Sequence, residues 1–197
     1  MSFEFLDDER YRKSLASVFQ DYYFELEGIV ELATIENHGI RPEGLTNEIY
    51  ALFHHISRSL CSITDVEQAA AEIDRAKKTH LKRAILDSYK ITINSLLKKT
   101  DSKVDLLEDL AADPDYRESI CSVLEDINPL RKFKKKIKFL YLDAKKTERK
   151  GDTDVAISLY NASLEKCVEL SEKIDEIDNN STYLLALKRI KRIEKAK

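Results

Sequence analysis

Apolar side chains recur along much of this chain at steps of three and four residues, and this spacing constrains the fold more than any other feature. Residues spaced in this way lie along one side of an α-helix and form a seam for a second helix. Only four glycines and three prolines occur among the 197 residues, so few points force a helix to end. The clearest seam consists of Tyr11, Leu15, Phe19, Tyr22, Leu26, Ile29 and Ala33.

These seams predict an all-α fold, a helical bundle of about six long helices in antiparallel hairpins, either as one body or as two sub-bundles. The first helix should begin near Asp7 and end at the segment HGIRPEG, residues 38–44. A second helix should cover residues 45–60. The segment TDVE, residues 64–67, matches a capping box, which predicts that a third helix starts there and runs to about Lys99. A short connection would place residue i of the second helix opposite about residue 128 − i of the third.

The charge of the chain changes sharply after residue 100. In residues 101–126, nine Asp or Glu side chains are accompanied only by Lys103 and Arg117. Pro114 should divide this acidic connector into two short helices, because a proline disfavours helical geometry in the preceding residue. We therefore expect an N-terminal bundle over residues 1–100 and a second domain over residues 101–197.

The second domain should contain a helical hairpin and a basic last helix. Asn128 and Pro129 suit the cap and first position of a helix, and Gly151 suits its end. Asp152 should cap the next helix, which extends to about Asp178. The segment from Ala144 to Glu165 resembles the turn and second helix of a TPR or MIT helical hairpin. This resemblance places Gly151, Ala156, Tyr160 and Ser163 at the close-packing positions.

The segment RKFKKKIKFLY begins the basic helix and is the strongest charge signal in the chain. Residues 131–150 hold ten Lys or Arg against Asp143 and Glu148. Such a helix could bind RNA, DNA or anionic lipid with strong salt dependence. Alternatively, it neutralises the acidic segments on either side of it, and both interpretations stay open. The candidate anion-binding residues are Arg131, Lys132, Lys134, Lys135, Lys136 and Lys138.

Polar residues on the second and third helices form another candidate site. The predicted register places His80 near Glu48, and His54 near Asp74. Lys77 falls within the apolar stripe of the third helix and therefore requires a partner. The set is either a functional polar site or a buried network that fixes the helix register or a dimer contact. Its members are Glu48, His54, His55, Arg58, Lys77, His80, Arg83 and Asp87.

His80 of this set also ends the segment Arg75-Ala-Lys-Lys-Thr-His80, which resembles the R-x4-H motif of HEPN ribonucleases, a family of helical proteins. The resemblance implies cleavage of RNA without a metal, usually across a dimer. Arg75 would hold the scissile phosphate, and His80 would transfer protons. On a straight α-helix, however, the two side chains point about 140° apart.

Motifs of most other enzyme classes are absent from the sequence. It contains no H-E-x-x-H or E-x-x-H motif, no glycine-rich phosphate loop and no G-x-S-x-G motif. Cys61, Cys121 and Cys167 are far apart and match no metal or redox spacing, so we expect free thiols, no metal and no cofactor. The acidic N-terminus and the lack of a long apolar run predict a cytoplasmic protein without a membrane span.

Two functional hypotheses follow from the sequence. The first is a non-catalytic helical protein–protein interaction or assembly module with coiled-coil-like seams, which self-associates as a homodimer or binds a protein partner. The second is an RNA-directed protein, either a ribonuclease that uses Arg75 and His80 or an RNA binder that uses the basic helix of residues 131–150. The first hypothesis makes the chain a non-enzyme, and the second leaves ribonuclease activity open.

Overall fold

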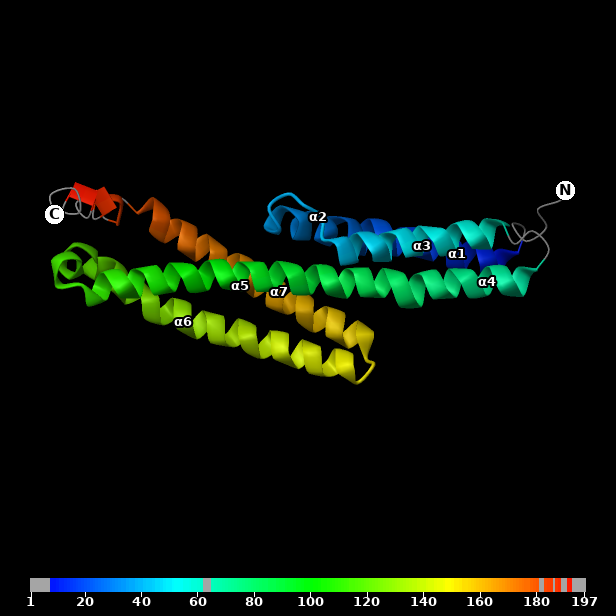
Figure 1. Cartoon of the computed structure of the whole chain (residues 1–197). Coiled ribbons are helices and arrows are strands. Elements are labelled where there is room, and N and C mark those ends of the chain that lie inside the picture. The colour runs from blue at the N-terminus through cyan, green and yellow to red at the C-terminus, as the bar shows by residue number, and fades with distance from the viewer. Residues whose placement is uncertain (1–7, 62–64, 181–182, 186, 189–190, 193–197) are drawn as a thin grey trace. The chain divides into compact units, whose positions relative to one another are not determined.

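The computed structural model describes residues 8–61, 65–180, 183–185, 187–188 and 191–192, without the side chains of 115–116, 118–119 and 121–127. Every regular element in this part of the chain is a helix, which confirms the predicted all-α class (Figure 1). The chain divides into two compact units, Met1–Thr92 and Ile93–Lys197, called unit 1 and unit 2 below. Among the described helices, none combines the length and the apolar content that crossing a membrane requires.

Unit 1 begins with a nearly uninterrupted helical segment, as the first seam predicts. It consists of α1 (Glu9–Asp21), the π-helical turn η2 (Tyr22–Leu26) and α2 (Glu27–Glu36). The side chain of Asp8 caps its start by accepting a hydrogen bond from the backbone nitrogen of Tyr11 at 2.8 Å. It ends where His38 and Gly39 adopt φ angles of 60° and 78°, within the predicted loop.

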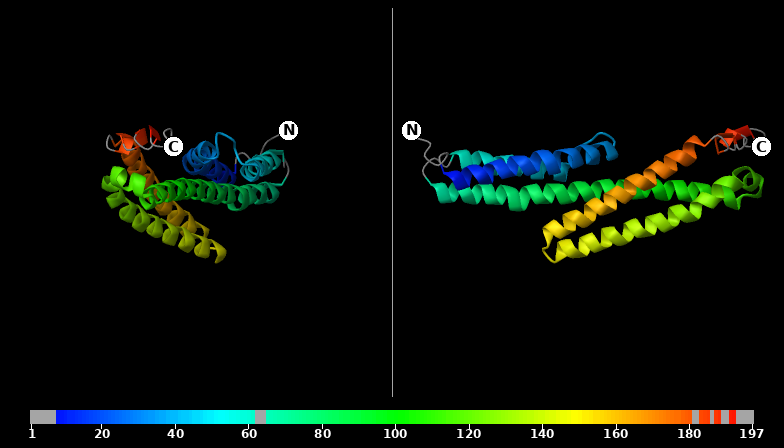
Figure 2. Two further views of the ribbon diagram at one scale, coloured as in Figure 1. Left: turned by 60° about the vertical axis from the view of Figure 1, so that its left-hand side comes forward. Right: turned by 180° about the vertical axis from the view of Figure 1, so that it is seen from behind.

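Helix α3 (Glu43–Cys61) packs on α4 (Val66–Arg75) and on the π-helical turn η3 (Ala76–Leu81), beside which it lies in Figures 1 and 2. Helix α1 also packs on α4, and the hydroxyls of Tyr11 and Ser59 lie 2.9 Å apart between α1 and α3. The core of unit 1 includes the buried side chains of Tyr11, Val18, Leu26, Leu45, Leu52, Ile56, Ile73 and Leu81.

The start of α4 differs from the predicted capping box. The carboxylate of Asp65 accepts a hydrogen bond from the backbone nitrogen of Gln68 at 3.0 Å, so Asp65 is the N-cap. Thr64, the predicted cap, lies outside the described residues. Aspartate is as good an N-cap as threonine, and one residue of shift lies within the usual uncertainty of a helix boundary.

Helix α5 (Lys82–Ala112) begins in unit 1 and continues into unit 2, well beyond Lys99, where the third helix was expected to end. The chain bends at Asp113, and α6 (Pro114–Arg149) follows, which confirms the predicted break. The prediction of two short connector helices was nevertheless wrong, because the two parts of the acidic connector are the end of α5 and the start of α6.

Pro129 lies inside α6 and does not begin a helix. Ile120 and Leu130, on either side of this stretch, are both buried. Packing of the two flanking segments can outweigh the single backbone hydrogen bond that a proline removes. The prediction of a new helix at Asn128 and Pro129 was therefore wrong for a reason that local sequence does not reveal.

In unit 2, α6 and α7 (Thr153–Asn179) lie side by side and meet at a tight turn (Figures 1 and 2). Gly151 has a φ of 86° in this turn, and Asp152 caps α7 through the backbone nitrogen of Val155 at 3.4 Å, as predicted. The expected close-packing positions Ala156, Tyr160 and Ser163 are all fully buried.

Candidate functional sites

A cluster of histidines and carboxylates connects α3 to the α4–η3 segment in unit 1. Nδ1 of His80 lies 2.7 Å from Oε2 of Glu48, where the predicted register places it. Nδ1 of His55 lies 2.5 Å from Oε2 of Glu72. The two imidazoles stack on each other, with ring centroids 5.0 Å apart and ring planes 17° apart. Because a carboxylate only accepts hydrogen bonds, each histidine donates its Nδ1–H.

An arginine completes each half of the cluster. Nη2 of Arg58 lies 3.2 Å from Glu72, and Nη1 of Arg83 lies 3.8 Å from Glu48. Each arginine follows its histidine by three residues, and both reach the carboxylate that this histidine contacts on the opposite helical segment. We call the six side chains the histidine cluster, and they are Glu48, His55, Arg58, Glu72, His80 and Arg83.

The two halves of the histidine cluster share a sequence pattern that the sequence analysis missed. Glutamate precedes histidine by seven residues in α3, from Glu48 to His55, and by eight in the other half, from Glu72 to His80. The additional residue falls where the π-helical turn η3 intervenes. Since a π-helical turn spans one more residue than an α-helical turn, η3 lets both halves present glutamate and histidine on one face.

Glu72 was missing from the predicted site, although it is the most buried acid of the cluster. Its side chain is 7% exposed, against 21% for Glu48. The hydrogen bond with His55 lowers the pKa of Glu72 from its usual value, against the opposing effect of burial, and Arg58 adds to the lowering. A signal was present in the sequence, since Glu72 lies beside Ile73 in the apolar stripe of α4, where a charged residue needs a partner.

Three predicted members lie outside the cluster. His54 is exposed at its rim, 5.8 Å from His55 between ring centroids, and its expected neighbour Asp74 pairs instead with Lys78 at 2.6 Å. Asp87 pairs with Lys90 at 2.9 Å. Lys77 has the partner that its position requires, because its Nζ lies 2.7 Å from the carboxylate of Asp21 and 2.5 Å from Oγ of Ser17.

Arg75 and His80, the residues of the R-x4-H motif, make different contacts. His80 belongs to the histidine cluster, whereas Arg75 is exposed and acts electrostatically on Glu72. The π-helical turn η3 begins directly after Arg75 and contains His80, and it places residues five apart closer to one face than a straight α-helix does. The predicted divergence of about 140° therefore does not apply to this segment.

The basic helix of residues 131–150 is the second half of α6, and three of its cations contact acids of α5. Arg131 and Lys134 form ion pairs with Glu108 and Asp101 of α5, and Nζ of Lys138 lies 4.0 Å from Asp101. The acidic segment therefore neutralises one side of this helix within unit 2. The aromatic rings on this helix also pack internally, since Tyr141 contacts Tyr160 of α7 at 5.7 Å between centroids.

Four other cations of this helix, Lys132, Lys135, Lys136 and Lys146, are exposed to solvent. None of their side chains forms an ion pair with a side chain in the described part of the structure, and they surround Phe139 and Leu142, which are 71% and 63% exposed. We call this surface the outer face of α6. It comprises Lys132, Lys135, Lys136, Phe139, Leu142, Asp143 and Lys146.

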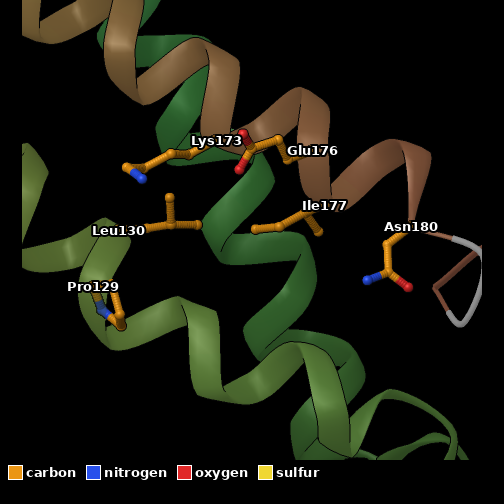
Figure 3. Close-up of a pocket in the computed structure, with 6 residues that line it drawn as sticks. All are labelled: Pro129, Leu130, Lys173, Glu176, Ile177 and Asn180. Carbon is orange, nitrogen blue, oxygen red and sulfur yellow. The ribbon is translucent and has the colours of Figure 1, made fainter.

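Other features of the described residues offer little chemistry. A hollow of 240 Å³ in unit 2 is lined by Pro129 and Leu130 of α6 and by Lys173, Glu176 and Ile177 of α7. Figure 3 shows these residues. This volume is below the range typical of small-molecule sites. Burial raises the pKa of the Cys167 thiol to about 12, which makes it a poor nucleophile. In the part of the chain that is described, no three His, Cys, Asp or Glu side chains are grouped as a metal site requires.

Comparison with known proteins does not assign this chain to a family. No protein-family model, no curated protein and no solved structure matches it. Inferences about its function therefore depend on its own residues and their geometry.

Proposed function

We propose that this chain is a non-catalytic helical interaction module that self-associates through an aromatic surface of unit 1. The observation that carries the proposal is a group of large aromatic side chains that lie in solvent instead of in the core. We call these side chains the aromatic face. Its members are Phe19 (45% exposed), Tyr23 (65%), Phe24 (75%), Tyr50 (74%) and Phe53 (38%).

Helical spacing and ring contacts connect several of these side chains. Phe19 and Tyr23 are four residues apart on the α1–η2 segment, and Tyr50 and Phe53 are three apart on α3. The ring of Tyr22 contacts that of Phe53 at 5.3 Å between centroids and so joins the two segments. The rings of Tyr23 and Phe24 are also 5.3 Å apart.

The area of the aromatic face approaches that of one side of a stable protein interface. The exposed fractions together equal about three fully exposed aromatic side chains, or roughly 600 Å² at about 200 Å² each. A stable protein interface of ordinary size buries about 800 Å² on each partner. These five side chains would therefore supply most of one such interface, and aromatic residues are enriched at interface centres.

A second copy of the chain is the partner that fits best. In a two-fold dimer the same surface meets itself, so a charge near the two-fold axis would oppose a like charge. All five side chains of the aromatic face are uncharged, and an uncharged surface avoids this repulsion. The polar groups of the histidine cluster pair among themselves inside unit 1, which favours a structural role for them over a catalytic one.

Light scattering coupled to size exclusion tests this proposal. We expect a concentration-dependent dimer, and we expect the double variant Phe24→Ser/Tyr50→Ser to weaken it by about 10- to 100-fold in Kd. The matched control is Phe139→Ser, which removes an equally exposed phenylalanine from unit 2 and should leave the dimer intact. A monomer at all concentrations, or equal dimerisation of the double variant, would contradict the proposal.

A second candidate function, metal-independent cleavage of RNA, is favoured by one observation. Donation of Nδ1–H from His80 to Glu48 leaves Nε2 as the basic nitrogen of His80. The imidazole of His55 stacks on the imidazole of His80. Incubation with RNA and a chelator tests this function. Cleavage that His80→Ala abolishes and Lys78→Ala preserves would support it, and the absence of cleavage by the natural chain would reject it.

A further inference from the structure

We infer that the outer face of α6 binds the surface of a membrane that contains anionic lipid. This face carries four lysines and one aspartate around two exposed apolar side chains, Phe139 and Leu142. The binding is peripheral, with lysines at the lipid headgroups and the two apolar side chains in the interface. It is independent of the aromatic face proposed above for self-association.

The geometry of α6 collects these side chains on one side of the helix. At about 100° per residue, all seven lie within about 60° of the direction of Phe139. Lys134 and Tyr141, which contact Asp101 and Asn94 of α5, and Ile137, whose carbonyl contacts Ser163 of α7, point about 140–160° away. From Lys132 to Lys146 the face extends along about 21 Å of a continuous helix.

The composition of the face favours lipid over nucleic acid. Leu142 cannot stack on a base, and Phe139 is the single aromatic residue among the seven, whereas single-strand binders use successive aromatic residues. The cations are lysines, and arginine is the residue that suits paired recognition of bases and phosphates. Phenylalanine and leucine flanked by lysines are, in contrast, typical of helices that lie on anionic membranes.

The pairing pattern of α6 explains how a chain with net charge −3 can be attracted to an anionic surface. The acids Asp101 and Glu108 pair with Arg131, Lys134 and Lys138, which lie outside the outer face. Lys132, Lys135, Lys136 and Lys146 are exposed to solvent, and Asp143 is the one acid among the seven side chains of the outer face. At physiological salt, charges farther than about 8 Å are screened, so this local field decides the interaction.

Co-sedimentation with vesicles tests the inference, using the full chain. The expected result is binding to vesicles that contain phosphatidylserine at about 0.1 M salt, weak binding to phosphatidylcholine vesicles, and loss of binding at about 1 M salt. Lys135→Glu/Lys136→Glu should lower the partition coefficient on the order of 100-fold. Phe139→Ser should lower it roughly 10-fold.

The matched control is Lys98→Glu/Lys173→Glu, which changes the net charge equally at exposed positions on α5 and α7. This variant should bind vesicles nearly as well as the natural chain. Circular dichroism would show that all variants are folded. Three results would overturn the inference: no binding to anionic vesicles, equal losses in the control variant, or binding of labelled RNA through the same lysines without binding to vesicles.

Discussion

Replacing Glu72 by glutamine tests whether the histidine cluster holds α3 and α4 together. The carboxylate of Glu72 is nearly buried and contacts Nδ1 of His55 at 2.5 Å and Arg58 at 3.2 Å. Glutamine has nearly the same size and can still hydrogen-bond, but it lacks the negative charge. The substitution therefore leaves two cationic or polar partners without the anion that they share.

The expected loss of unfolding free energy is about 2 kcal/mol. A hydrogen bond to a charged group contributes roughly 1.5–3 kcal/mol, and removal of one partner of a buried pair costs about 3–5 kcal/mol. The lower part of this range applies, because glutamine keeps one hydrogen bond and Arg58 is half exposed. For a chain of this length, about 2 kcal/mol corresponds to a fall in Tm of roughly 4–8 °C.

Thermal unfolding followed by circular dichroism at pH 7 measures this change. The control is Glu67→Gln, which removes the same charge from an exposed position on the same helix and should change the stability by less than about 0.5 kcal/mol. If Glu72→Gln unfolds at the same temperature as Glu67→Gln, the cluster does not stabilise unit 1, and the reasoning is refuted.

The pH dependence of stability, compared between the natural chain and Glu72→Gln, gives a second test. Because the hydrogen bond with His55 holds the pKa of Glu72 below its ordinary value of 4.5, the ionised carboxylate favours the folded state. This contribution is fully present above pH 4.5 and is lost as the pH falls through the lower pKa of the folded state. The difference in Tm between the natural chain and Glu72→Gln should therefore persist at pH 7 and shrink in acid below about pH 4.

Three further predictions concern other parts of the chain. Since burial raises the pKa of Cys167 to about 12, iodoacetamide at about pH 8 should label the exposed Cys61 and leave Cys167 unmodified until the protein is denatured, and mass spectrometry would detect equal labelling if this is wrong. Burial disfavours the charged form of Lys103, but hydrogen bonds to Asp178 and Tyr183 outweigh this effect and raise its pKa above the ordinary value of 10.5. The stabilisation is therefore fully present below pH 10.5 and is lost as the pH rises through the raised pKa of the folded state. Asp178→Asn should therefore lower the Tm by a few degrees at pH 8, and a difference that grows as the pH rises above 10.5 would contradict this assignment. Pro129→Ala should raise the Tm by roughly 2–4 °C by restoring a hydrogen bond inside α6, whereas a lower Tm would indicate that a helix begins at this proline.

Helix class and several helix ends could be predicted because they depend on neighbouring residues. The ring of Pro114 disfavours helical geometry at Asp113 and so ends α5. Gly151 supplies a positive φ, and Asp152 caps the helix that follows. The contact between Glu48 and His80 was also within reach, since a short connection nearly fixes the register of the two segments. Pro129 shows the limit of such reasoning, because the packing of both flanking segments overrides a strong local signal for a helix start.

The sequence by itself determined that the chain is helical, where most helices begin and end, and that one helix is strongly basic. Only the tertiary structure decided that η3 lets Glu72 and His80 share a face, and that Arg131, Lys134 and Lys138 meet acids while Lys135 and Lys136 meet solvent. The physical reason is the range of the interactions. Backbone geometry and capping act over a few residues, whereas pairing of charges acts through space between segments far apart in the sequence.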